Sequence, residues 1–222
     1  MTKKELIRRY LIFTAGLVFT SFGIAFTTKS GLGTSPISAI PYSLSLILPE
    51  WSMGKWTILF SLLLILIQLV LQRRRAKKAE LLLQLIVTAP FGYLIDLGIF
   101  CLSPFEPQSY PMRLLFLLIG CFVVAFGVYF QVVANVVMLS GDAFVRAVAG
   151  VMDKEFGRIR MVSDIAMTAI ALLLCLIFLG GLRGVREGTV MAAIFVGNIV
   201  RLYDKRLARL KEWLVGWESN GS

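Results

Sequence analysis

The sequence predicts an all-α polytopic membrane protein, and three observations lead to this fold class. Hydrophobic residues make up 58% of the 222 residues, and only 16% are charged, whereas roughly a quarter are charged in a soluble domain. The mean hydropathy is +0.81. The charges are also bunched, so that runs such as FSLLLILIQLVLQ and MTAIALLLCLIFLGGL contain none. Apolar stretches of this length are typical of helices that cross a bilayer.

Six apolar segments are long enough to cross, at about 20 residues per span. They cover residues 7–28, 56–72, 81–101, 113–134, 160–180 and 188–203. Two further segments, 36–49 and 141–152, are shorter and contain Gly, Pro or charged residues, so we expect short broken or re-entrant helices there. The N-terminal apolar stretch is too long for a signal peptide and no A-x-A-like site follows it, so we expect a retained first helix.

The basic residues predict the orientation of the chain. If the two short segments do not cross, 18 of the 23 basic residues lie on the side of the N-terminus and 5 on the other. If segment 36–49 alone crossed, the cluster RRRAKK would lie outside, against the positive-inside rule. We therefore expect cytoplasmic N- and C-termini. The net charge is +10, and the basic residues that produce it flank apolar segments instead of forming one patch. We therefore expect the lipid bilayer as a partner and no nucleic acid.

The segment 204–222 is expected to be a cytoplasmic tail. Apolar side chains recur there at helical spacing with basic residues opposite, which is typical of an amphipathic helix on a membrane surface. These apolar residues are Tyr203, Leu207, Leu210, Leu214 and Trp217.

The two halves of the chain resemble each other. Gly16 and Gly23 lie seven residues apart, and so do Gly120 and Gly127. An irregular polar segment with a short helix follows each pair, then a long helix that opens with SMGKW or EFGRI, and finally TAPFGYLID or AAIFVGNIVR. The glycine pairs indicate close helix packing.

The matching elements are offset by 103 to 105 residues. We interpret residues 1–104 and 113–203 as two repeats, each with three spans and one short helix. Because three is odd, the second repeat enters the membrane from the opposite side, which gives the inverted 3+3 repeat of many secondary transporters.

The segment SGLGTSP is the first candidate binding segment. Gly31 and Gly33 permit unusual backbone angles and close approach. Thr34 or Ser35 suits the N-cap of a helix, and Pro36 suits its first position. A helix that begins within the membrane presents N–H groups and a positive dipole end to a polar or anionic solute. The alternative is a plain helix-loop-helix corner at the bilayer surface.

The second candidate binding segment is SGDAF. Ser140 or Asp142 is the expected N-cap there, and Gly141 lies between them. In an inverted repeat the two short helices approach each other near the midplane, so we expect both segments to contribute to one solute site.

Ionisable residues in predicted spans are candidates for ion coupling, because their burial in a membrane is costly. Arg160 and Asp164 are four residues apart, and an ordinary salt bridge is the alternative explanation for this pair. A carboxylate at the start of a short helix, as at Asp142, is suited to take up a proton or a cation. The coupling candidates are Asp96, Asp142, Asp164 and Glu187.

The function predicted from these features is secondary transport of a small polar or anionic solute. The alternative is a non-transporting scaffold or assembly partner, and a channel or lipid-moving protein is less favoured. No enzyme, cofactor or metal site is expected, because the sequence has no His, no C-x-x-C spacing, no P-loop and no nucleophile motif. A homo-oligomer is compatible with the sequence.

Four motifs carry a family resemblance: GLGTSPISAIPYSLSL, FGYLIDLG, VMLSGDAFVRA and GVREGTVMAAIFVGNIVRL. In this order they resemble the YczE/YyaS/YitT group of bacterial membrane proteins, especially its YczE-like branch, over residues 7–203. The resemblance implies a multi-pass protein of the bacterial cytoplasmic membrane and an acidic residue, often Glu, at the position of Asp142. It implies no particular substrate.

Overall fold

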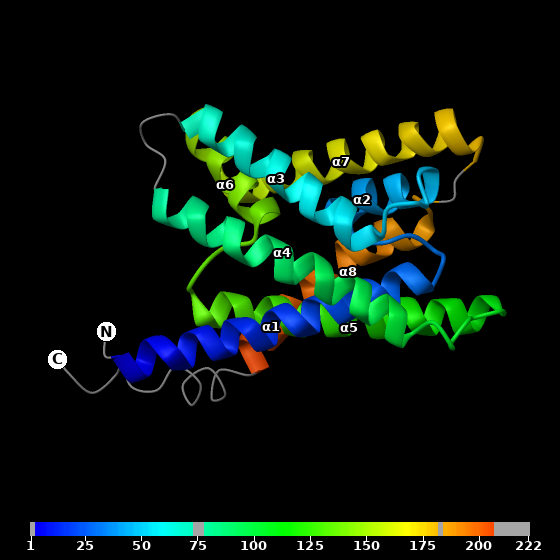
Figure 1. The fold of residues 1–222 in the computed structure, drawn as a ribbon, viewed down its shortest axis with the longest axis horizontal. Helices are drawn as coiled ribbons and strands as arrows, with labels where there is room; N and C mark the ends of the chain where they lie inside the picture. Colours follow the sequence, from blue (N-terminus) through cyan, green and yellow to red (C-terminus); the bar gives the residue numbers. More distant parts are fainter. Residues whose placement is uncertain (1–2, 73–77, 182–183, 207–222) are drawn as a thin grey trace.

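The described residues of the computed structural model, 3–72, 78–181 and 184–206, form eight helices (Figure 1). The order of lengths is long, short, long, long, and this order occurs twice. The helices are α1 (Lys3–Lys29), α2 (Pro36–Ile47), α3 (Met53–Gln72), α4 (Lys78–Cys101), α5 (Tyr110–Ala134), α6 (Ser140–Met152), α7 (Phe156–Leu179) and α8 (Glu187–Arg206).

Five of these helices, α1, α3, α4, α5 and α7, are long and apolar enough to cross a membrane. The protein is therefore a multi-pass membrane protein. The predicted sixth span forms α8, but its described part is not among these five, and it carries charged residues near both ends, Glu187 and Arg201. Its crossing stays a prediction. The predicted tail beyond residue 206 lies outside the described residues, as does most of the cluster RRRAKK.

Local sequence explains several helix ends. Ser35 is the N-cap of α2 and Pro36 its first residue, which confirms the predicted start of this helix. The predicted N-cap of α6 is wrong: Leu139, with an extended backbone, occupies that position, and Ser140 begins the helix. Asn135 ends α5 in the left-handed conformation that Asn tolerates better than most residues.

The most extensive helix–helix packing of the fold joins α1 and α5, which lie side by side in opposite directions along the lower edge of Figure 1. The predicted close packing at the glycines is confirmed. A Cβ on Gly16 would lie 2.8 Å from the carbonyl oxygen of Gly127, and a Cβ on Gly23 would lie 3.0 Å from that of Gly120. Real Cβ atoms do not approach a backbone atom as closely as 2.8 Å, and a Cβ on Gly23 would also lie 2.5 Å from the backbone nitrogen of Val124, so only glycine permits this spacing of the two helices.

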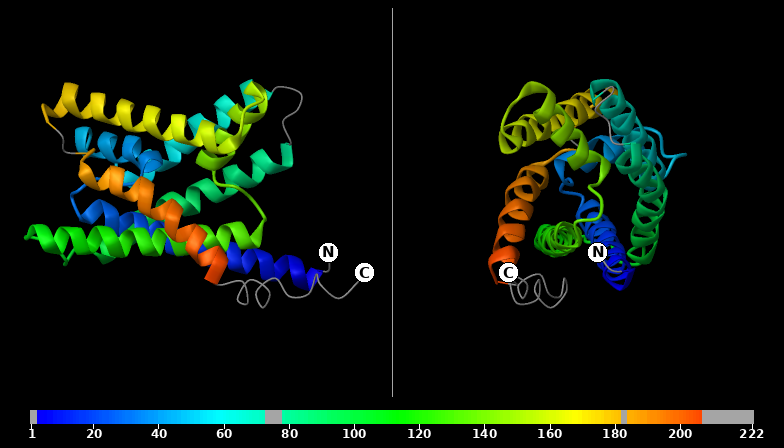
Figure 2. Two further views of the ribbon diagram at one scale, coloured as in Figure 1. Left: turned by 180° about the vertical axis from the view of Figure 1, so that it is seen from behind. Right: turned by 90° about the vertical axis from the view of Figure 1, so that its left-hand side faces the viewer.

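The other helices lie beside this pair and above it in Figure 1. α4 packs against α1 and α8 against α5, while α2 and α6 each pack against both α3 and α7. Viewed along the long axis, α3 and α4 lie on one side and α8 on the other (Figure 2, right). Large apolar side chains are exposed on the outer faces of α3 and α7, among them Leu66, Val70, Ile165 and Ile177. We interpret these faces as lipid-facing.

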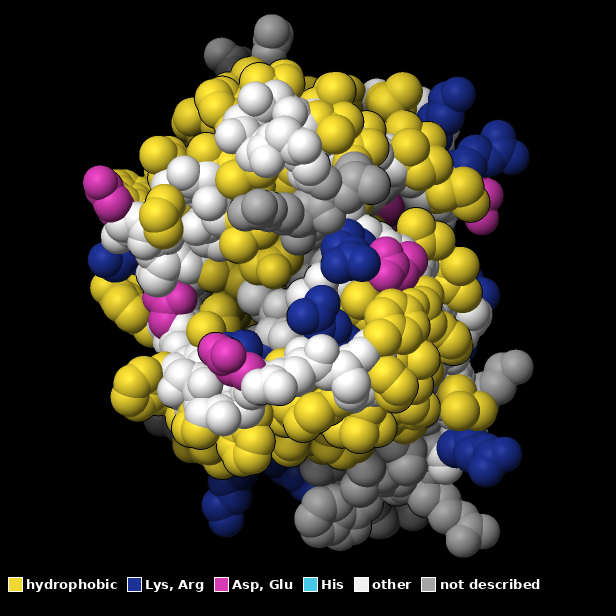
Figure 3. All heavy atoms as spheres, turned by 90° about the vertical axis from the view of Figure 1, so that its right-hand side faces the viewer, with side chains coloured by type: hydrophobic (Ala, Val, Ile, Leu, Met, Phe, Trp, Pro, Cys, Tyr) yellow, Lys and Arg dark blue, Asp and Glu magenta, His cyan; other side chains and the backbone are white. Residues whose placement is uncertain are grey.

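The right-hand end of the molecule is seen face-on in Figure 3. Hydrophobic side chains cover much of this surface, and Lys, Arg, Asp and Glu side chains lie both on the face and at several points of its outline.

Candidate functional site

The two short helices begin next to each other in the interior of the bundle. α2 then runs to the right-hand end of Figure 1 and α6 to the left-hand end. Their starts are in contact, because a Cβ added to Gly141 would collide with the side chain of Ile37. The first N–H groups of each helix lack acceptors within the helix, and neither N-cap residue caps a backbone N–H of its own helix with its side chain.

A cavity of about 120 Å³, the central cavity, lies where these two helices begin. Each of the eight described helices contributes to its lining. Most of the polar side chains that line it are hydroxyl-bearing, and the ionisable ones come from α6 and α7. The polar and charged lining residues are Thr20, Ser35, Ser38, Thr57, Ser61, Ser140, Asp142, Arg160 and Asp164.

Three charged side chains form one network in the central cavity. Arg160 donates from one terminal nitrogen to Asp142 Oδ1 and from Nε to Asp164 Oδ2, the latter over 3.3 Å. The side chains of Asp142 and Asp164 are 33% and 24% exposed. The predicted pair of Arg160 and Asp164 is therefore present, but it includes Asp142 as a third member. One guanidinium is shared by two carboxylates, which leaves one negative charge in excess.

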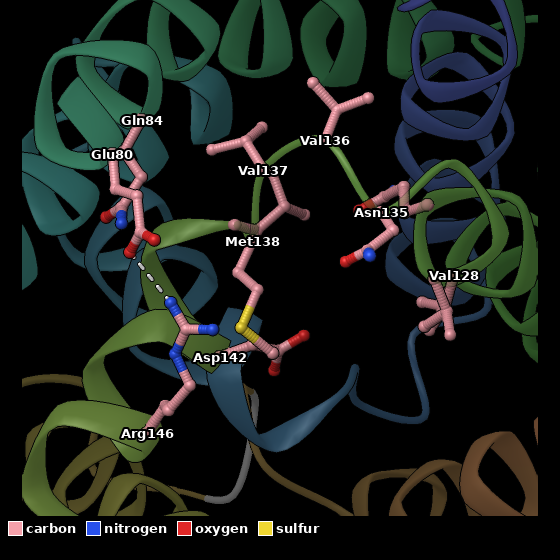
Figure 4. A pocket seen from close by; sticks show the side chains of 12 residues that line it. Glu80, Gln84, Val128, Asn135, Val136, Val137, Met138, Asp142 and Arg146 are labelled. Carbon is pink, nitrogen blue, oxygen red and sulfur yellow. Dashed lines mark hydrogen bonds and ion pairs between the residues drawn. The ribbon is translucent and has the colours of Figure 1, made fainter. Parts of the chain in front are cut away.

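A second cavity, the vestibule, has a volume of about 270 Å³ and lies between α4, α5 and α6 (Figure 4). Val128, Leu139 and Asp142 line both the vestibule and the central cavity. Across the vestibule, Arg146 donates to Glu80 Oε2 over 2.9 Å. Arg146 shares a helix face with Asp142, as its spacing predicts, but its ion pair is made with α4. Asp142 thus stands at the boundary between the two cavities.

The loop from residue 30 to residue 34 lies against the start of α8. The Gly188 N–H donates to the Leu32 carbonyl oxygen over 2.9 Å, and a Cβ on Gly33 would collide with Thr189 Oγ1. The backbone of Gly33 has a φ of +105°, which requires glycine. Thr34 is fully buried, and its hydroxyl hydrogen-bonds that of Thr27 over 3.1 Å.

The predicted binding residues thus divide into two groups. Ser35, Ser140, Gly141 and Asp142 line the central cavity. Gly31, Gly33 and Thr34 lie in the loop instead, where they shape the chain between α1 and α2 and are not part of the lining of either cavity. Their contribution to a site is to position Ser35 at the start of α2.

Two of the predicted coupling residues lie elsewhere. Asp96 accepts a hydrogen bond from Ser52 Oγ at 2.6 Å and another from the Gly54 N–H at 2.7 Å, so its carboxylate caps the start of α3. Glu187 is the first residue of α8 and forms an exposed ion pair with its neighbour Arg186. Neither residue lines the central cavity or the vestibule.

Sequence reasoning missed the contributions of Gln84 and Gln131 to the vestibule. Gln131 donates to Thr20 Oγ1 over 2.7 Å and thereby links α5 to α1 beside the glycine contacts. The available signal was a Gln inside an apolar membrane helix, as in LLLQLIV and VYFQVVA, because such residues in spans usually face the protein interior.

Two comparisons with known proteins give a match, one to a relative and one to a family. Over 92 residues it is 35% identical to the "Uncharacterized protein YyaS" of Bacillus subtilis (strain 168), a match that covers 41% of this chain and 43% of that protein. No solved structure matches the chain. Residues 7–205 match the family of unknown function DUF6198. The predicted resemblance to YyaS-like proteins is thus confirmed, and the chain belongs to the DUF6198 family.

Proposed function

We propose that this protein is a secondary transporter of a small polar solute, with the central cavity as its binding site. The observation that carries the proposal is the meeting of α2 and α6, one short helix from each half of the chain, at a cavity whose largely apolar lining includes hydroxyl and charged side chains. Broken helices that begin at such a cavity, lined by both halves, are typical of transporters built from inverted repeats.

The contacts between α1 and α5 support the inverted repeat. Gly16 and Gly23 of the first repeat correspond to Gly120 and Gly127 of the second, 104 positions later. Gly16 contacts Gly127, and Gly23 contacts Gly120. Each contact is therefore the equivalent of the other, which is the pattern that a two-fold axis between the helices produces.

The same offset relates further contacts. A Cβ on Gly23 would lie 2.5 Å from the nitrogen of Val124, and a Cβ on Gly127 would collide with the nitrogen of Thr20, the residue equivalent to Val124. Ile37 and Gly141, the residues through which α2 and α6 touch, are also 104 positions apart. The axis would therefore pass through both the glycine contacts and the central cavity.

The charge network suits ion coupling better than anion binding. Arg160 is already held by two carboxylates, and Pro36 removes one N–H from the start of α2. The anionic solute that the sequence left open is therefore less favoured. An added proton or cation would compensate the excess negative charge of Asp142, Arg160 and Asp164, and would free Arg160 to change partner.

Uptake into proteoliposomes tests this proposal. A defined mixture of polar metabolites is supplied under an inward proton gradient, and the accumulated compounds are identified by mass spectrometry. We expect at least one solute to accumulate, and we expect Asp142→Asn to reduce its uptake roughly tenfold, a difference of about 1.4 kcal/mol. Asp153→Asn, an exposed aspartate at the other end of α6, is the matched control.

Two results would contradict the proposal. Uptake by the Asp142→Asn variant at the wild-type rate would remove Asp142 from coupling. Accumulation no greater than in liposomes without protein would favour the scaffold alternative, whose own test is deletion of residues 204–222.

A further inference from the structure

The start of α8 packs tightly against the chain that leads into α2. The Gly188 N–H donates to the Leu32 carbonyl oxygen over 2.9 Å, and a Cβ on Gly188 would lie only 2.5 Å from that oxygen. A Cβ on Gly184 would lie 2.5 Å from Ser43 Oγ of α2. These contacts, which we call the α8 closure, leave no room for a solute between the two segments.

The equivalent place in the first half of the chain is open. Glu80 and Gln84 stand 104 positions before Gly184 and Gly188, and both line the vestibule of about 270 Å³. The loop before α6, residues 135–139, also lines it (Figure 4). A cavity therefore lies between the start of α4 and this loop, where the other half of the chain has direct contact.

The loops before the two short helices differ in the same way. Leu32 is fully buried, whereas Val136, 104 positions later, is half-buried and lines the vestibule. The start of α8 packs against α2, whereas no comparable packing joins α4 to α6 among the described residues. The ion pair of Glu80 and Arg146 bridges α4 and α6 across the vestibule instead. The two halves thus hold equivalent segments in different conformations.

This difference gives the central cavity one open side. The vestibule and the central cavity share lining residues, among them Asp142, whereas none of the four residues of the α8 closure lines the central cavity. The starts of α4 and α8 lie toward opposite ends of the bundle (Figure 1). The central cavity is therefore reached from the end at which α4 starts and is separated from the other end by the α8 closure.

We propose that this structure is the state in which a solute reaches the central cavity through the vestibule, and that the two halves exchange their conformations to reach the opposite state. In that state the start of α4 packs against residues 135–139 and closes the vestibule, while the start of α8 leaves Leu32 and opens the other end. In transporters built from inverted repeats, one repeat gates against the other around a fixed site. The inference rests on the proposed transport function and assigns the path to its site.

The reactivity of two reporter cysteines in the purified full-length protein tests the inference. Val136→Cys reports on the vestibule, and Leu32→Cys, at the equivalent position, reports on the α8 closure. All variants carry Cys101→Ser, Cys121→Ala and Cys175→Ala, which removes the native thiols. A small charged methanethiosulfonate is the probe, and mass spectrometry follows labelling with time in detergent. We expect Val136→Cys to react at least about tenfold faster than Leu32→Cys, which reacts only when the α8 closure opens.

Two equivalent pairs of cysteines trap the two states as disulfides. Ser43→Cys with Gly184→Cys joins α2 to the segment before α8, where the spacing in this structure is within reach of a disulfide. Glu80→Cys with Ala147→Cys is the matched pair at the 104-residue offset, which the opposite state brings to the same spacing. Oxidation forms each disulfide, and peptide mapping identifies it.

The two disulfides should have opposite effects on the reporters. The first should abolish labelling of Leu32→Cys and leave Val136→Cys reactive. The second should protect Val136→Cys and speed labelling of Leu32→Cys roughly tenfold or more, because the opposite state becomes the main one. Gly188→Ala, whose Cβ meets the Leu32 backbone, should also speed labelling of Leu32→Cys. Gly197→Ala is its control on the same helix, because nothing lies within 4 Å of that Cβ.

Three outcomes would overturn the inference: equal labelling rates of the two reporters without a disulfide, failure of the second disulfide to form, or its formation with Leu32→Cys still protected. Loss of folding would expose both reporters at once and is thereby distinguished from the exchange. Labelling requires no transport, so the two proposals fail separately. Reciprocal labelling without solute uptake into proteoliposomes would refute the transporter alone, and uptake without reciprocal labelling would refute only the exchange.

Discussion

Three aspartates in apolar helices have different surroundings, and this separates their roles. Asp96 caps α3 through two hydrogen bonds. Asp142 and Asp164 share Arg160 in the central cavity. A carboxylate whose oxygens are held by an N–H and a hydroxyl stabilises the fold, whereas carboxylates that compete for one guanidinium can respond to an added cation.

Replacing Asp96 with Ala should lower stability and leave solute binding intact. The start of α3 would lose its cap, so we expect a loss of about 1–2 kcal/mol and a lower Tm in detergent. Asp96→Asn should lose less, because its amide oxygen still accepts one hydrogen bond. Wild-type stability in Asp96→Ala together with lost uptake would instead return Asp96 to ion coupling.

At this scale the sequence predicted part of the candidate site. Asp142 was identifiable because a carboxylate at the start of a short polar segment is costly in a membrane. Its pairing with Arg160, 18 residues away, was not. The spacing of four residues predicted Asp164 as a partner of Arg160. Asp142 becomes a second partner only because α6 packs on α7.

Among the elements, the two short helices were predictable because Gly, Pro and charge interrupt the apolar pattern. The start of α2 was predictable in detail, since Pro36 at a first helical position has a geometric reason. The start of α6 was not, because Leu139 takes the N-cap conformation without any capping side chain. Ser140 has another role there: its carbonyl oxygen accepts from Gln68 of α3.

Alanine substitutions at two membrane-helix glycines should have opposite effects. In Gly23→Ala the new Cβ would lie 2.5 Å from the nitrogen of Val124, which forces α1 and α5 apart at a cost of about 1–3 kcal/mol. In Gly197→Ala nothing lies within 4 Å of the new Cβ, so the higher helix propensity of Ala should raise stability by up to about 1 kcal/mol. Thermal unfolding of both variants in detergent measures the difference, and equal Tm values would contradict the assigned contact.

For the whole molecule, the sequence predicted a multi-pass helical protein from its apolar runs, and the described helices agree with this. Which helices pack together was beyond the sequence, because apolar side chains suit many neighbours. The packing is also not fully symmetric: α3 packs along α4, whereas no comparably extensive packing joins α7 to α8 among the described residues. Neither the positions of the charged residues nor the repeat pattern predicts this difference between the α3–α4 and α7–α8 packing.

The orientation predicted from the basic residues can be tested with single cysteines. Cys101 is exposed and is first replaced by Ser, while Cys121 and Cys175 are buried. In intact cells a membrane-impermeant maleimide should label Lys55→Cys, at the start of α3, and should not label Lys154→Cys, after α6. Permeabilised cells should label both, and the reverse pattern in intact cells would invert the topology.

The glycine contacts between α1 and α5 also restrict how the molecule can move. If one helix slid along the other by a single residue, a side chain would take the place of Gly23 or Gly127 against the opposing backbone. The two helices therefore keep a fixed register during any conformational cycle. If the proposed transport takes place, we expect the central cavity to open by movement of other helices relative to this pair, and a disulfide that joins α1 to α5 should leave transport intact.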